Sequence, residues 1–113
     1  MGRISTHILD TSRGRPAAGV KIEVYAVDGE ERTLLGQTVT NADGRTDEPV
    51  VAMPDIPQGI YELLFHVGPY LSKMDGEAFY DIVPLRFRVS DGAGHYHVPL
   101  LITSWSYATY RGS

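Results

Sequence analysis

The sequence predicts an all-β protein that folds as a two-sheet β-sandwich of about seven or eight short strands. Segments in which apolar and polar residues alternate recur along the 113 residues, and this period of two is typical of half-buried strands. Clusters of Gly, Pro, Asn and Asp separate these segments, as the turns of a sandwich do. The length fits a single domain over residues 1–113 and leaves no room for a second hydrophobic core.

Strand patterns occur in several segments. In chain order they are ISTHILD (4–10), VKIEVYAV (20–27), IYELLFHV (60–67), VPLRFRV (83–89), HYHVPLLIT (95–103) and SWSYATY (104–110). In the second segment every other residue from Val20 to Ala26 is apolar, which predicts one buried face. The third segment is apolar on both faces, so we expect a strand that is covered on both sides. Pro84 lacks an N–H group, which places it near the start of its strand or on a sheet edge.

The segment GPYLSKMDGEA (68–78) departs from this pattern and predicts a helix of about two turns that stops at Gly76. Turn signals lie between the strands, at RGRPAAG (13–19), DGEE (28–31), NADG (41–44), PDIPQG (54–59) and SDGAG (90–94). The chain contains no internal repeat, linker or low-complexity segment, which agrees with one domain.

Composition and charge exclude several classes of function. The net charge of −4 argues against a broad phosphate-binding surface, so we expect no nucleic-acid partner. No apolar run approaches the roughly 18 residues of a membrane-spanning helix, so we expect no membrane partner. The absence of cysteine excludes a disulfide, a thiolate nucleophile and a cysteine zinc site. The N-terminus lacks a signal-type apolar stretch and the C-terminus is not a peroxisomal S-K-L, so we expect a bacterial cytoplasmic protein.

The histidines are the first candidates for chemistry. His95 and His97 stand two residues apart in HYHVP, so in a strand they share one face. His7 lies in ISTHILD on the same face as Ser5, but spacing alone does not show that it meets His97. These residues could be strand histidines bonded to backbone groups or to water. They could also form part of a zinc site, with His95, His97 and a third ligand from elsewhere.

Two arginines and the last residue are further candidates. Arg45 follows the NADG turn. Arg45 and Arg111 could each be solvated surface residues, or each could pair its planar guanidinium with a urea-like or imide-like edge of a ligand. Ser113 offers a hydroxyl and an α-carboxylate, or it could simply fray. The glycine-containing turns lack phosphate-loop spacing, and no G-x-S-x-G nucleophile motif is present.

Three segments of the sequence, taken together, resemble a known protein family. STHILDTSRGRPAAGVKIEVY near the start, NADGR in the middle and HYHVPLLITSWSYATYRGS at the end stand in one order. This chain resembles the transthyretin-like family and, within it, the 5-hydroxyisourate hydrolases. The likeness spans essentially the whole chain, and the ending Y-R-G-S is its most specific part. The chain departs from the usual SPFGYSTYRGS ending at Ser104 and Ser106, and it has FYDIV where the family usually has a sequence like FFPEV.

The resemblance implies a fold, an assembly and a set of site residues. The fold is a sandwich of eight strands with one short helix after the fifth strand. The assembly is a homotetramer, a dimer of dimers, with active sites in clefts at the dimer–dimer interface. The implied catalytic residues are His7, Arg45, His97 and Ser113. The implied substrate-binding residues are His7, Arg45, Tyr110, Arg111 and Gly112, and the family needs no metal or other cofactor.

The implied reaction is the hydrolytic opening of the six-membered ring of 5-hydroxyisourate, which gives 2-oxo-4-hydroxy-4-carboxy-5-ureidoimidazoline. In this hypothesis, His7 or His97 activates a water molecule and the other histidine orients it or protonates the leaving nitrogen. Arg45 holds a substrate oxygen, and Ser113 fixes the tautomer of a histidine. Two alternatives remain open: a non-catalytic carrier of a small ligand, and a zinc hydrolase that uses His95 and His97 with His7.

Overall fold

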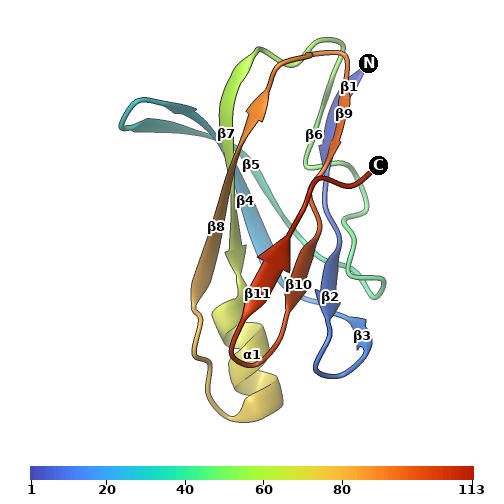
Figure 1. The fold of residues 1–113 in the computed structure, drawn as a ribbon, viewed down its shortest axis with the longest axis vertical. Helices are drawn as coiled ribbons and strands as arrows, with labels where there is room; N and C mark the ends of the chain where they lie inside the picture. Colours follow the sequence, from blue (N-terminus) through green and yellow to red (C-terminus); the bar gives the residue numbers. More distant parts are fainter.

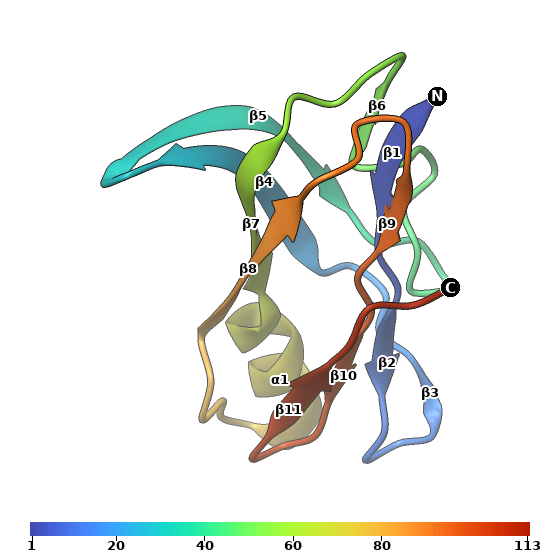
Figure 2. The same cartoon turned by 45° about the horizontal axis from the view of Figure 1, so that its top comes forward.

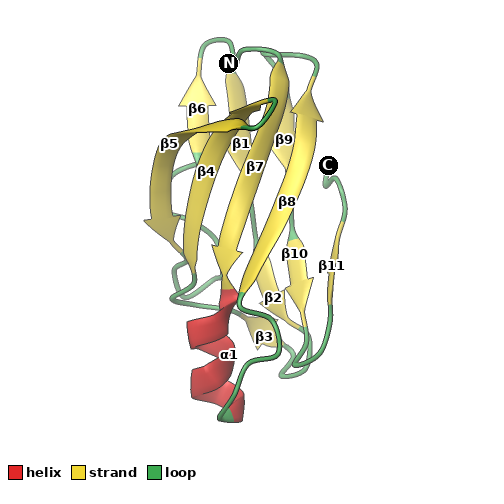
Figure 3. Ribbon diagram, turned by 90° about the vertical axis from the view of Figure 1, so that its left-hand side faces the viewer, coloured by secondary structure: helices red, strands yellow, loops and turns green.

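Two β-sheets face each other across one hydrophobic core, and a short helix lies at one end (Figures 1 and 3). The structure is a computed structural model that describes residues 1–113. The first sheet is antiparallel throughout, and its strands stand in the order β5 (Glu31–Val39), β4 (Lys21–Asp28), β7 (Gly59–His66) and β8 (Ile82–Val89). Its two edges are therefore β5 and β8.

The second sheet contains two interrupted strands at its centre. Its strands are β1 (Gly2–Ser5), β2 (Ile8–Asp10), β3 (Arg15–Pro16), β6 (Val51–Met53), β9 (His95–His97), β10 (Leu100–Ile102) and β11 (Tyr107–Thr109). β1 runs on into β2, and β9 runs on into β10 in parallel with them. Backbone bonds of 2.9 Å from Val98 N–H to the Ser5 carbonyl, and from Leu100 N–H to the His7 carbonyl, join the halves across the interruption. The centre of this sheet is therefore one bent, continuous pair of parallel strands.

The helix α1 (Val67–Asp75) follows β7 directly, and the predicted stop at Gly76 is confirmed. Gly76 adopts φ 85°, and its N–H donates to the Ser72 carbonyl at 2.8 Å. A left-handed residue at this position is the usual glycine end of a helix. No helix in the structure combines the length and the apolar character that crossing a membrane requires.

The predicted core faces are confirmed for most strands. Val20, Ile22 and Val24 are at most 2% exposed, and Tyr61, Leu63 and Phe65 of the neighbouring β7 are buried on the same face of the sheet. The opposite face of β7 is not covered by a second layer, contrary to the sequence expectation. Its Glu62 is nevertheless only 5% exposed. Two guanidinium groups bond its carboxylate, Arg32 of the edge strand β5 at 2.9 Å and Arg86 of the neighbouring β8 at 2.8 Å.

Several strand boundaries differ from those predicted. The 95–103 segment breaks before Leu100 because Pro99 cannot donate to the ladder. The 104–110 segment is a strand over Tyr107–Thr109 alone, since Thr103 and Ser106 close a hairpin turn through a 2.9 Å backbone bond. β5 and β6 were not recognised in the sequence. β5 lies at the edge of its sheet with both faces largely exposed, so it lacks the alternation that marks a half-buried strand.

The predicted eight-strand arrangement is nonetheless confirmed. When each interrupted strand is counted once and the two-residue β3 is set aside, eight strands remain, and α1 follows the fifth. Pro84 lies near the start of β8, which is also an edge strand, so both features expected of that residue are present.

Candidate functional site

The candidate site lies where the two central strands of the second sheet are interrupted. His7 stands in the gap between β1 and β2, and His97 ends β9 just before its own gap. β1 and β9 pair in parallel with Ser5 opposite His97, so the two gaps lie side by side. Figure 2 shows the C-terminal segment returning to the same level of the sheet. The sequence could not show that His7 meets this region, because β1 and β9 lie about ninety residues apart in the chain.

The NADGR turn docks beside His7. Arg45 forms an isolated antiparallel bridge with His7, and the Ile8 N–H donates to the Gly44 carbonyl at 2.8 Å. Gly44 has φ 72°, and a Cβ at this position would lie 2.3 Å from the Ile8 carbonyl oxygen. This close approach explains why glycine precedes Arg45. The turn therefore brings the exposed Arg45 to the edge of the histidine region.

The backbone of the same turn also orients the His7 ring. The Nε2–H of His7 donates to the Asp43 carbonyl at 2.9 Å, because a carbonyl oxygen can only accept. In the neutral form of His7 the lone pair is then on Nδ1. The imidazole of His7 is thus held in one tautomer by a backbone group.

Ser5 is a site residue that the sequence did not reveal. Its Oγ lies 2.8 Å from His97 Nδ1 and 2.8 Å from His95 Nε2. This arrangement leaves His97 Nε2 without a hydrogen-bond partner from the chain. A possible signal was that Ser5 shares a strand face with His7, but its pairing with β9 depends on a long-range register that no local pattern encodes.

Burial and its electrostatic surroundings both lower the pKa of His97 below its ordinary value. Burial is the largest cause, the Arg45 guanidinium is the next, and the neighbouring His95 and His7 follow in that order. His97 is therefore a neutral imidazole at neutral pH, and its Nε2 can accept a proton in the tautomer in which Nδ1 carries the hydrogen. Arg45, His95 and His7 therefore all lie within electrostatic range of His97.

The C-terminal segment packs onto His97 through Gly112. The Gly112 N–H donates to the His97 carbonyl at 2.8 Å, and the two residues form an antiparallel bridge. A Cβ at position 112 would lie 2.6 Å from Cδ2 of His97, so the glycine backbone lies directly against the imidazole. Ser113 follows as an exposed residue next to this contact.

Two other predicted residues lie away from the imidazole rings. The guanidinium of Arg111 stacks over the Tyr96 ring at 4.4 Å, and its NH2 group lies 3.5 Å from the His95 carbonyl. Tyr110 is 59% exposed and lines a groove between β8 and the C-terminal segment. The structure thus brings together His7, Arg45, His97 and Gly112, while Tyr110 faces the neighbouring groove.

The zinc arrangement considered from the sequence does not form within the chain. His95 and His97 both bond Ser5, and their ring centroids are 6.2 Å apart. No group of three or more His, Cys, Asp or Glu side chains is placed to hold a metal ion. The arrangement of side chains is instead suited to acid–base chemistry on a water molecule, with a guanidinium nearby to hold an anionic oxygen.

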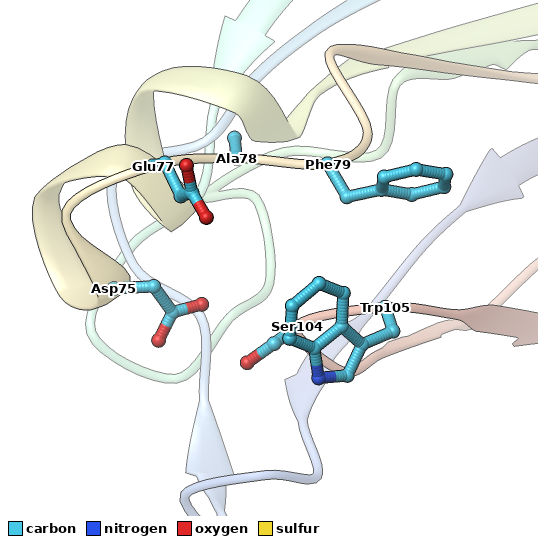
Figure 4. A pocket seen from close by; sticks show the side chains of 6 residues that line it. All are labelled: Asp75, Glu77, Ala78, Phe79, Ser104 and Trp105. Atoms are coloured by element: carbon cyan, nitrogen blue, oxygen red, sulfur yellow. The ribbon is translucent and has the colours of Figure 1, made fainter.

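A second hollow lies at the end of the sandwich, beside the C-terminal end of α1 (Figure 4). It measures about 330 Å³ and is lined by Asp75, Glu77, Ala78, Phe79, Ser104 and Trp105. Phe79 and Trp105 are 67% and 71% exposed, and Ser104 is one of the departures noted in the sequence. None of the predicted site residues lines this hollow.

Comparison with known proteins finds relatives that match this chain over nearly its whole length. A family model described as the HIUase/Transthyretin family matches residues 4–112. A 5-hydroxyisourate hydrolase from Deinococcus radiodurans is 52% identical over 113 residues, which cover 97% of this chain and 95% of the relative. The solved structure of Klebsiella pneumoniae 5-hydroxyisourate hydrolase is 36% identical with a TM-score of 0.84, and the match covers both chains completely. Transthyretin from Sparus aurata has a TM-score of 0.88 at 26% identity and covers 97% of this chain and 96% of its own.

Proposed function

The chain belongs to the HIUase/transthyretin family, and on this premise we propose that it hydrolyses 5-hydroxyisourate. The observation that carries the proposal is the meeting of a neutral His97, His7 and Arg45 at the interrupted centre of one sheet. The likeness to named hydrolases supports it, because the chain is 52% identical to the Deinococcus radiodurans enzyme and only 26% identical to the Sparus aurata transthyretin.

The reaction opens a cyclic amide, and the protein must assist three steps of it. A water molecule must lose a proton as its oxygen bonds to the ring carbonyl carbon, and the negative charge that develops on the carbonyl oxygen must be stabilised. The C–N bond then breaks, and the leaving nitrogen must receive a proton. No electrons are exchanged with an external donor, so hydrolysis requires no redox partner.

His97 is proposed as the general base. Its Nδ1 is occupied by Ser5, while Nε2 is free, so the water proton would be taken at Nε2. The lowered pKa keeps the ring neutral at neutral pH. Nε2 then has the lone pair in the tautomer in which Nδ1–H donates to Ser5. His7 is proposed to orient the water or to protonate the leaving nitrogen, with its ring held by the Asp43 carbonyl.

Arg45 and the C-terminal residues complete the proposed site. The exposed guanidinium of Arg45 would bind a substrate oxygen and stabilise its developing charge. Ser113 would bond a histidine, and the Gly112 bridge to His97 supports this because it brings the tail to the imidazole. Tyr110 and Arg111 are proposed as substrate contacts, and the exposed ring of Tyr110 is free to meet a neighbouring molecule.

Gly112→Ala is expected to lower turnover by about 10²-fold, as misplacing a catalytic group by roughly 1 Å does. The new methyl group would lie 2.6 Å from His97 Cδ2, so either the ring or the tail must move. Gly36→Ala is the matched control, because a Cβ at Gly36 meets nothing within 4 Å. Equal steady-state rates for the two variants would show that the tail contact does not position His97.

We also propose the homotetramer, a dimer of dimers with sites at the dimer–dimer interface. The chain leaves several large apolar side chains exposed, and assembly would bury those that lie at a subunit interface. They are Met1, Leu34, Leu35, Val39, Phe79, Ile82, Trp105, Tyr107 and Tyr110. The strands β8 and β11 also end their sheets with unpaired edges, which can pair with another copy.

The tetramer is tested by light scattering on the purified protein after gel filtration. The expected mass is about 50 kDa, four times the chain mass of 12.5 kDa. A mass near that of one chain at micromolar concentration would contradict the assembly.

The proposed setting is a bacterial cytoplasm, which a chain without cysteine suits and which agrees with the source of the Deinococcus radiodurans relative.

The proposed activity is tested by following the ultraviolet absorbance of freshly generated 5-hydroxyisourate. Decay faster than the spontaneous rate supports hydrolysis. If the protein binds 5-hydroxyisourate but the compound still decays at the spontaneous rate, the result would favour a carrier. A parallel assay after treatment with a strong chelator addresses the zinc alternative. Full activity after chelation is expected, and its loss with recovery on adding zinc would support a metalloenzyme.

A further inference from the structure

We propose that Ser5 is a positioning residue whose hydroxyl couples the proton positions of His95 and His97 and thereby switches His97 between its base and acid forms. This inference rests on the proposed hydrolysis for its catalytic meaning. The Oγ of Ser5 lies 2.8 Å from His97 Nδ1 and 2.8 Å from His95 Nε2. The parallel register of β1 and β9 produces this arrangement by placing Ser5 opposite His97 and Arg3 opposite His95.

The hydrogen-bond capacity of a hydroxyl makes the two contacts unequal. Serine has one O–H to donate and two lone pairs with which to accept. Ser5 can therefore donate to one imidazole only, and it must accept from the other if both bonds are made. When both rings are neutral, the direction of the Ser5 hydroxyl fixes the tautomer of each ring.

The two directions give His97 opposite chemical roles. In one state His97 Nδ1–H donates to Ser5, and Ser5 donates to His95 Nε2, which leaves a lone pair on His97 Nε2. In the other state His95 Nε2–H donates to Ser5, and Ser5 donates to His97 Nδ1, so His97 Nε2 carries the proton. The first state can accept a proton from water, and the second can donate one.

The same path lets a proton leave the site after water activation. Once His97 Nε2 has taken the water proton, the ring is an imidazolium with protons on both nitrogens. Its Nδ1 proton can pass to Ser5 Oγ as the Ser5 proton passes to His95 Nε2. The positive charge then lies on His95, and His97 is a neutral ring with Nε2–H. Every proton is accounted for, and no bond to carbon changes in this step.

Exposure of His95 and the surroundings of His97 favour outward movement of the proton. His95 is exposed, whereas His97 is half-buried. Arg111 acts in the opposite direction, because its cationic NH2 group lies 3.5 Å from the His95 carbonyl oxygen and disfavours positive charge at His95. Burial first, and then the charge of Arg45, lower the pKa of His97. An imidazolium is therefore costly at His97, and solvent stabilises it better at His95.

The test compares Ser5→Ala with Ser5→Thr in the full chain. Ser5→Ala is expected to lower kcat at least about tenfold, the cost of losing one hydrogen bond to a charged group, with little change in KM. Ser5→Thr keeps the hydroxyl and should restore most of the turnover. Thr11→Val is the control, because it removes a hydroxyl that bonds the Ile102 carbonyl at 3.0 Å, outside the histidine group. A smaller loss in Ser5→Ala, or equal loss in both Ser5 variants, would overturn the proposal.

A second measurement reads the coupling without any substrate. The ¹⁵N chemical shifts of His97 report which ring nitrogen carries the proton. We expect His95→Asn to change the His97 tautomer populations when Ser5 is present and to leave them unchanged in Ser5→Ala. Insensitivity of the His97 signals to His95→Asn with Ser5 present would overturn the coupling. Because this arm needs no turnover, it remains informative even if 5-hydroxyisourate proves not to be a substrate.

Discussion

Replacing His97 with asparagine is expected to lower kcat for 5-hydroxyisourate by about 10²–10⁴-fold, the contribution of a positioned general base. An asparagine amide can still reach Ser5, because it replaces the part of the ring that carries Nδ1. It has no counterpart of Nε2, the nitrogen that is free to accept the water proton. The variant therefore removes the base while keeping the local contact, and the fold should be retained. Steady-state rates and thermal melting measure the two effects separately.

His66→Asn is the matched control for this experiment. His66 ends β7 in the other sheet and bonds Glu23 rather than any residue of the candidate site. We expect its loss to leave turnover unchanged, although it removes the Glu23 contact and so can lower the melting temperature. Normal turnover in His97→Asn would show that His97 does not act as the base.

Arg45→Gln is expected to lower kcat/KM by about 10²–10³-fold, as removal of one group that stabilises a developing oxyanion does. It should also change the pH dependence. Burial and then the Arg45 charge hold the pKa of His97 below its ordinary value. Removal of the charge leaves the effect of burial, so the pKa rises only part of the way toward its usual value of about 6.5. The acid limb of kcat/KM should therefore move to higher pH.

Arg45→Lys separates charge from geometry at the same position. Lysine keeps the positive charge but lacks the planar fork that can hold an imide-like edge. The acid limb should then stay near its original pH while the rate still falls. A limb that does not move in Arg45→Gln, or that moves to lower pH, would contradict the placement of Arg45 beside His97.

Much of the fold could be predicted because local patterns report burial. Strands with one buried face, such as β4, alternate clearly, and a glycine after α1 marks the end of the helix. β5 could not be recognised, because a strand whose two faces are both largely exposed has no hydrophobic alternation. The strand break at Pro99 could have been predicted, because proline cannot donate a backbone hydrogen bond to the neighbouring strand. The sequence does not show that this break helps to form the candidate site.

The candidate site was less predictable from local patterns because distant segments build it. The shared face of His95 and His97 follows from strand geometry, and the structure agrees with it. The double contact of Ser5 depends on the register between β1 and β9, which is fixed by packing of the whole sheet. The need for glycine at position 112 depends on a backbone contact with His97, and that contact appears only when the tail has folded back.

The most direct test of the account follows the absorbance of freshly generated 5-hydroxyisourate with catalytic amounts of the wild-type protein, beside equal amounts of His97→Asn. The account predicts that the wild type removes the substrate many times faster than spontaneous decay and that His97→Asn approaches the spontaneous rate. A wild-type trace that follows spontaneous decay would contradict the proposed hydrolysis. A His97→Asn trace that matches an active wild type would contradict the role given to His97.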